Sequence, residues 1–127
     1  MEATKKIYDL HQDHKDWLNT LAFYKDEVKV MTSRLEEIAR KNTGKELLTS
    51  VEHFQNQLII QREQIDILSH EVNRREKELE NNINANPTAV DHRKIEDESD
   101  LRDKVATFGK MFEELRKEFA SFLAKSM

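Results

Sequence analysis

The chain has 127 residues, of which 36% are charged, with 21 Lys and Arg against 25 Asp and Glu. It contains two glycines, one proline and no cysteine. So few helix breakers exclude a sheet protein with many turns, and the missing cysteines exclude a disulfide framework, a thiolate zinc site and a cysteine nucleophile. We therefore expect a few long helices in a single domain over residues 1–127.

Charge and hydropathy restrict the partners that such a chain can have. The net charge is −4 with both signs interspersed, so we expect no basic face that would neutralise nucleic-acid phosphates. Uninterrupted apolar runs such as Leu58–Ile60 extend over no more than four residues, far fewer than the roughly 20 of a membrane span. The first residues enter a charged amphipathic segment without the apolar stretch of a signal peptide. These features predict a cytoplasmic protein that binds no nucleic acid and does not span a membrane.

A seven-residue hydrophobic repeat runs through most of the sequence. Apolar side chains recur at the two core positions of each heptad, which is typical of helices packed in a left-handed bundle. The repeat has three sections, which predict helices over about residues 4–41, 44–83 and 98–125.

The segments between these sections carry turn signals. Asn42 or Gly44 is expected to end the first helix in a left-handed conformation, and Thr43 with Glu46 forms a capping box for the next helix. An asparagine cluster and the single proline close the second helix, and we expect an irregular or partly helical connection over about residues 84–97.

The core positions of the three sections fit together as antiparallel neighbours. Pairing Leu35 with Phe54, and Leu21 with Leu68 further along, places the first turn at Gly44, where the turn signals lie. The sequence therefore predicts an all-α, up-down-up antiparallel three-helix bundle with coiled-coil-like packing. In size and pattern, including Trp17 at a core position of the first helix, it resembles a spectrin-type repeat, and this resemblance concerns the fold alone.

Polar side chains interrupt the predicted core at a few positions. His14 and Arg75 lie opposite each other, and extending the third section backwards places Glu98 beside Arg75. Gln61 occupies another core position, where the Tyr24 hydroxyl is its candidate hydrogen-bond partner. We interpret His14, Arg75 and Glu98 as a polar core layer that fixes the register or lies at a solvated end of the bundle, with acid–base chemistry or anion binding as the alternative. Gln61 and Tyr24 are further polar residues of the core with a structural role, and a ligand-binding role is the alternative for them.

No catalytic motif occurs in the sequence. There is no phosphate-binding glycine loop, and of the five histidines only His14 points into the predicted core, without the Glu-x-x-His spacing of metal-binding bundles. We predict no cofactor and no metal, and a non-enzymatic module for protein–protein interaction or scaffolding. The alternative is a metal- or small-ligand-binding bundle that uses His14, Arg75 and Glu98.

Five large apolar side chains occupy heptad positions that a three-helix core does not use. They are Phe23 and Val30 in the first section and Ile59, Ile60 and Ile67 in the second. All five fall near mid-length, and an apolar band on a charged rod is typical of an association surface. We expect the bands of two copies to meet in a homodimer, or another helical protein to use the same surface. The other possibility is that packing within the chain covers part of the band.

Overall fold

The computed structural model describes the backbone of residues 2–85 and 92–126 and the side chains of residues 8–82 and 99–126. Within this part of the chain the backbone is helical apart from one short turn, and it contains no strand. The predicted all-helical class is confirmed.

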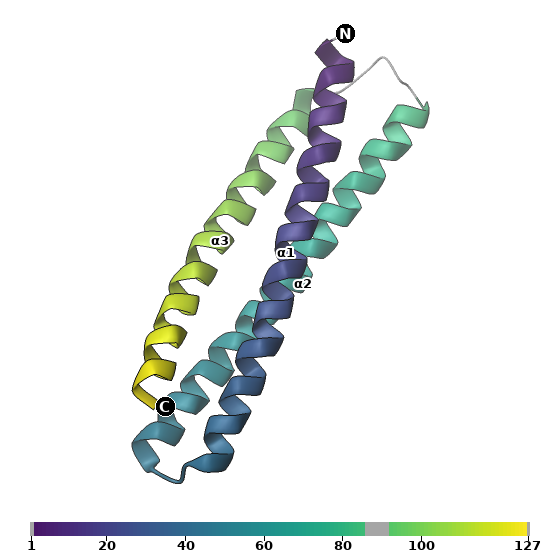
Figure 1. The fold of residues 1–127 in the computed structure, drawn as a ribbon. Helices are drawn as coiled ribbons and strands as arrows, with labels where there is room; N and C mark the ends of the chain where they lie inside the picture. The colour runs from purple at the N-terminus through teal and green to yellow at the C-terminus, as the bar shows by residue number, and fades with distance from the viewer. Residues whose placement is uncertain (1, 86–91, 127) are drawn as a thin grey trace.

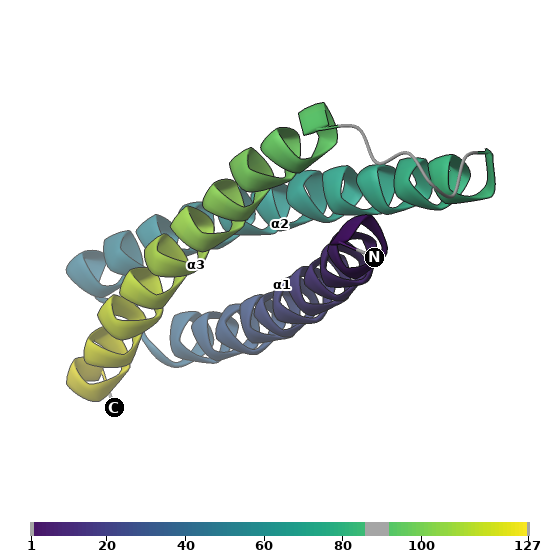
Figure 2. The same cartoon turned by 90° about the horizontal axis from the view of Figure 1, so that it is seen from above.

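Three helices account for this structure: α1 (Glu2–Lys41), α2 (Lys45–Ala85) and α3 (His92–Ser126). They run down, up and down the long axis, so the start of α1, the end of α2 and the start of α3 share one end of the molecule (Figure 1). Each helix packs against the other two (Figure 2). The arrangement is the predicted antiparallel three-helix bundle. None of the helices in the described part of the chain is both long and apolar enough to cross a bilayer.

The start of α3 differs most from the sequence expectation. The third helix was expected over about residues 98–125, after an irregular or partly helical connection over about residues 84–97, and α3 begins at His92, inside that connection. The residues added at its start include no glycine or proline, and their helix propensity outweighs the lack of apolar core positions there. The remainder of the expected connection, residues 86–91, lies outside the described residues.

The turn between α1 and α2 lies at the predicted place but is built differently. No described residue has a positive φ, so neither Asn42 nor Gly44 takes the expected left-handed conformation. Instead the Asn42 side-chain amide donates a hydrogen bond of 2.9 Å to the carbonyl of Ile38. The Gly44 carbonyl accepts a bond of 3.0 Å from the Leu48 amide, which makes Gly44 rather than Thr43 the first residue of the α2 hydrogen-bond pattern.

The buried core follows the heptad positions of all three helices. Leu35 and Phe54, which the register pairs, are both buried, as are Leu21 and Leu68. Trp17 is partly buried and packs against this cluster. From α3 the core receives Leu101, Val105, Phe108, Phe112, Leu115 and Phe119.

Candidate functional site

A polar layer lies toward the end of the bundle where α1 begins. His14 is only 1% exposed, and its Nδ1 lies 2.9 Å from Oε2 of Glu76 on α2. The other Glu76 oxygen, Oε1, lies 2.5 Å from Nδ1 of His11. Because His11 and His14 are three residues apart on one helix, their rings reach the same carboxylate. Glu76 therefore links α1 to α2 through two imidazole groups.

The sequence prediction missed Glu76 and placed Arg75 opposite His14 instead. In the structure Arg75 Nη2 lies 3.1 Å from Oε1 of Glu71, one turn earlier in α2. Lys104 Nζ of α3 lies 3.7 Å from the same oxygen. The structure thus pairs Arg75 with Glu71 rather than with His14. The signal that could have identified Glu76 is its flanking heptad position, directly after the polar core residue Arg75.

The predicted contact of Glu98 with Arg75 falls on a side chain outside the described residues. It therefore stays a prediction.

Gln61 lies in the core as expected, but without the partner expected for it. Its side chain is 7% exposed, and its Oε1 is buried with no hydrogen-bond partner among the described residues. The Tyr24 hydroxyl does not serve this oxygen. The Tyr24 ring packs instead on α3, with centroid distances of 4.4 Å to Phe112 and 5.9 Å to Phe108. Gln61 is thus an unsatisfied polar group in an apolar layer.

Within the described part of the chain, no three His, Asp or Glu side chains converge in a way that could hold a metal ion. His14 packs against Trp17, with ring centroids 5.7 Å apart, and lines none of the hollows described below. The polar layer is best described as a link between helices.

The five apolar residues that were expected to form a band are all exposed. Their exposed fractions lie between 46% and 56%. They are Phe23, Val30, Ile59, Ile60 and Ile67.

These five residues do not lie on one face of the bundle. Ile59 lines a groove between α1 and α2, whereas Ile60 and Ile67 line a groove between α2 and α3. Phe23 lies on the α1–α3 side, where the Arg116 guanidinium of α3 sits 5.8 Å from its ring centroid. The predicted band is therefore divided among three faces.

The antiparallel pairing of α1 and α2 explains this division. In an antiparallel pair, equivalent flanks of the two helices meet on one side of the core and the other flanks meet on the opposite side. Ile59 belongs to the flank that faces α1. Phe23 of α1 and Ile60 of α2 lie on the opposite side of this pair of helices. There α3 packs between α1 and α2, so Phe23 is on one side of α3 and Ile60 is on the other. The sequence predicts how far along the bundle an exposed residue lies. The face of the bundle on which it lies depends also on the position of the third helix.

Met111 of α3 is an exposed apolar residue that the sequence prediction missed. It is 55% exposed and lines the α2–α3 groove together with Ile60 and Ile67, around a hollow of about 620 Å³. Met111 occupies a heptad position that normally covers the flank of the core, so the sequence alone gave no reason to expect it outside. We name Ile60, Ile67 and Met111 the α2–α3 patch.

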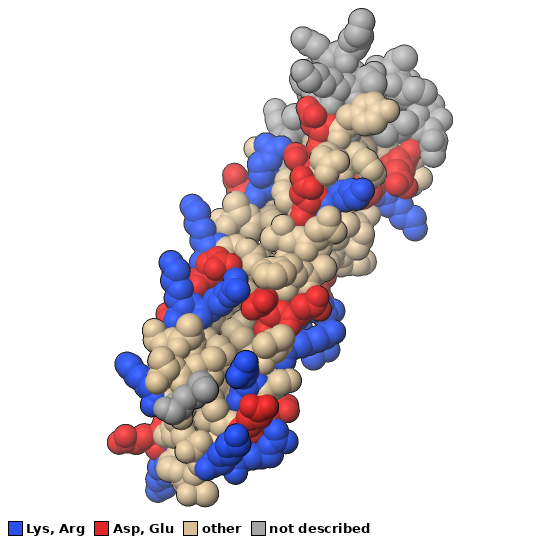
Figure 3. Space-filling view, in the orientation of Figure 1, with Lys and Arg blue, Asp and Glu red and all other residues tan. Residues whose placement is uncertain are grey.

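Charged side chains of both signs are spread over the face of the molecule drawn in Figure 3. Figure 3 shows acidic and basic groups alternating along the visible face, with uncharged areas between them. Ion pairs on the surface tie helices together, among them Lys25 with Asp66 at 2.8 Å and Arg102 with Asp13 at 2.8 Å. Such exposed pairs add little stability, so the uncharged areas are the better candidates for binding.

The chain matches no family model, no curated protein and no solved structure at a significant level. Its function is therefore inferred from its own surface chemistry.

Proposed function

We propose that this chain is a non-enzymatic helical module that acts through protein–protein association, and that its first partner is a second copy of itself. The observation that carries the proposal is the α2–α3 patch. Ile60 and Ile67 are seven residues apart and share one stripe of α2, and Met111 extends that stripe across the groove onto α3.

Contact between two such patches gives a favourable free energy of association. Burying a large aliphatic side chain that was exposed contributes about 1.5–3 kcal/mol, and each copy would bury three that are now about half exposed. A two-fold axis midway between Ile60 and Ile67 would bring the isoleucines of two copies together. Two-fold symmetry uses the same surface on both subunits, so a single patch is sufficient.

Sedimentation equilibrium tests the proposal directly. The wild-type chain should sediment as a dimer at micromolar concentration, and Ile60→Lys/Ile67→Lys should sediment as a monomer with unchanged helix content by circular dichroism. The matched control is Phe23→Lys/Val30→Lys, which places the same charges on the α1–α3 side and should remain dimeric.

Two outcomes contradict self-association through this patch. One is a wild-type chain that stays monomeric at high micromolar concentration, which would leave a different helical protein as the partner. The other is dissociation by the Phe23 and Val30 changes alone, which would place the interface on the α1–α3 side. A cytoplasmic location stays a prediction of the composition.

A further inference from the structure

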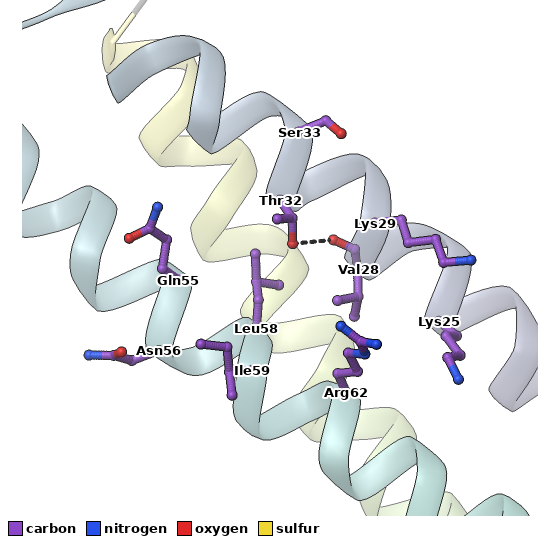
Figure 4. A pocket seen from close by; sticks show the side chains of 10 residues that line it. All are labelled: Lys25, Val28, Lys29, Thr32, Ser33, Gln55, Asn56, Leu58, Ile59 and Arg62. Atoms are coloured by element: carbon purple, nitrogen blue, oxygen red, sulfur yellow. Dashed lines mark hydrogen bonds between the residues drawn. The ribbon is translucent and has the colours of Figure 1, made fainter. Parts of the chain in front are cut away.

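A second groove, between α1 and α2, differs from the α2–α3 groove in its charge, because its charged lining residues are all basic. It encloses about 500 Å³, and all of its lining residues belong to α1 and α2. Figure 4 shows α3 behind the two helices, so the groove opens away from it. The groove is independent of the α2–α3 patch, which lies on another face.

Three cationic side chains gather at one end of this groove. Lys25 and Lys29 extend from α1 and Arg62 from α2, and no acidic residue is among the lining residues (Figure 4). Lys25 is paired with Asp66 at 2.8 Å, and its hydrogen bond lowers the pKa of that carboxyl below the ordinary value. Lys29 and Arg62 make no ion pair with any described residue, so their charges are available to a partner.

The remainder of the groove is aliphatic in the middle and polar at the far end. Val28 and Leu58 form a buried floor, and Ile59 stands exposed beside them. Figure 4 shows the side-chain amides of Gln55 and Asn56 at the end opposite the cations. The groove therefore offers apolar contact, hydrogen bonding and an excess of positive charge in one place.

We propose that the α1–α2 groove binds an acidic amphipathic helix of a partner protein. A helix that lays apolar side chains on Ile59 and carboxylates on Lys29 and Arg62 satisfies both features at once. Between Lys25 and Ser33 the groove extends along about two helical turns, or about 12 Å, which is sufficient for two or three anchor side chains. Within a chain of net charge −4, such a cationic groove favours an acidic partner over a basic one.

The probe is a labelled synthetic helix of about four turns with leucines on one face and glutamates on its flanks. Its matched counterpart carries lysines in place of the glutamates. Fluorescence anisotropy with the full chain should show binding of the glutamate peptide only, and binding should weaken as ionic strength rises. In Lys29→Glu/Arg62→Glu, affinity for the glutamate peptide should fall about tenfold or more, and the lysine peptide should begin to bind.

The control variant is Lys110→Glu/Lys117→Glu, which changes the net charge equally but on the α1–α3 side. It should bind the glutamate peptide like the wild type. If it loses affinity as much as the groove variant, the long-range charge of the chain explains binding and the groove does not. If circular dichroism shows that the charge reversals unfold the chain, Lys29→Gln/Arg62→Gln provides the same test with a smaller perturbation.

Three further results would overturn the proposal. The first is equal binding of both peptides by the wild type. The second is binding of a single-stranded oligonucleotide that Lys29→Glu/Arg62→Glu abolishes, which would assign the cations to phosphates. The third is a wild-type dimer that this variant converts to a monomer, because the occupant would then be a second copy. Ile60→Lys/Ile67→Lys should leave peptide binding unchanged, so the two proposals can fail separately.

Discussion

Tyr24 of α1 lies directly over Gly109 of α3. A β-carbon at Gly109 would be 3.3 Å from the Tyr24 hydroxyl oxygen and 4.0 Å from Cε2. Gly109 is in the middle of a helix, where glycine costs about 1 kcal/mol relative to alanine. Glycine at this position therefore serves packing, because the absence of a side chain lets the Tyr24 phenol lie against the backbone of α3. The Tyr24 and Phe112 ring centroids are then 4.4 Å apart.

The effect of Gly109→Ala on the free energy of unfolding should therefore depend on the residue at position 24. In the wild type the gain in helix propensity is offset by the close hydroxyl, so the free energy of unfolding should change little. In Tyr24→Phe the hydroxyl is absent, and Gly109→Ala should stabilise the chain by about 0.5–1 kcal/mol. Urea unfolding of the four chains measures this coupling. An equal gain in both backgrounds would mean that the hydroxyl does not restrict position 109.

Tyr24 also gives the chain a dependence on alkaline pH. Burial raises its pKa above the ordinary value of 10.0, the nearby Glu113 carboxylate raises it further, and Arg116 opposes them. Above pH 10 the unfolded chain loses this phenolic proton before the folded chain does. The unfolded state then binds fewer protons, so the free energy of unfolding should fall as pH rises.

Comparing the free energy of unfolding of wild type and Tyr24→Phe at each pH separates the effect of Tyr24 from that of the lysines, which titrate in the same range. The loss of stability between pH 9 and pH 11 should be smaller in Tyr24→Phe, and Glu113→Gln should lower the pH at which the Tyr24 phenolate absorbs. Identical pH profiles for wild type and Tyr24→Phe would show that the Tyr24 pKa is the same in the folded and unfolded chains.

The sequence predicted which residues are buried better than it predicted which residues touch. A heptad repeat specifies the core side of each helix, so Leu21, Leu35 and Phe112 were predicted as core residues and are fully buried. Contacts on the flanks depend on which helix packs beside each flank. The contact of His14 with Glu76 forms because Glu76 lies on the flank of α2, beside its core positions. Phe23 and Ile60 lie apart because α3 packs between the flanks on which they stand. The sequence left the start of α3 open within the irregular or partly helical connection, because charged residues in core positions do not stop a helix that has no breaker.

Glu76 offers a direct test of the link between α1 and α2. Glu76→Leu removes the acceptor that lies 2.9 Å from Nδ1 of the buried His14. Because a buried polar atom that loses its hydrogen bond costs about 1–3 kcal/mol, the loss at His14 Nδ1 should lower the free energy of unfolding by about that amount. The control is Glu78→Leu, which breaks the exposed pair with Arg74 and should change stability by less than about 0.5 kcal/mol. Equal losses in both variants would show that Glu76 acts as an ordinary surface residue.

The unpaired oxygen of Gln61 leads to the opposite prediction. Gln61 is 7% exposed and its Oε1 has no partner, so the folded chain bears the cost of removing this group from water. Gln61→Leu replaces the amide by methyl groups on a side chain one carbon shorter, and it should stabilise the bundle by about 1–2 kcal/mol in urea unfolding. The control is Gln64→Leu, one turn further along α2, where the side chain is exposed and stability should change little. A loss of stability in Gln61→Leu would contradict this account and show that the amide has a partner in solution. A gain in stability with less dispersed amide resonances in NMR would show instead that Gln61 keeps the three helices in a single register.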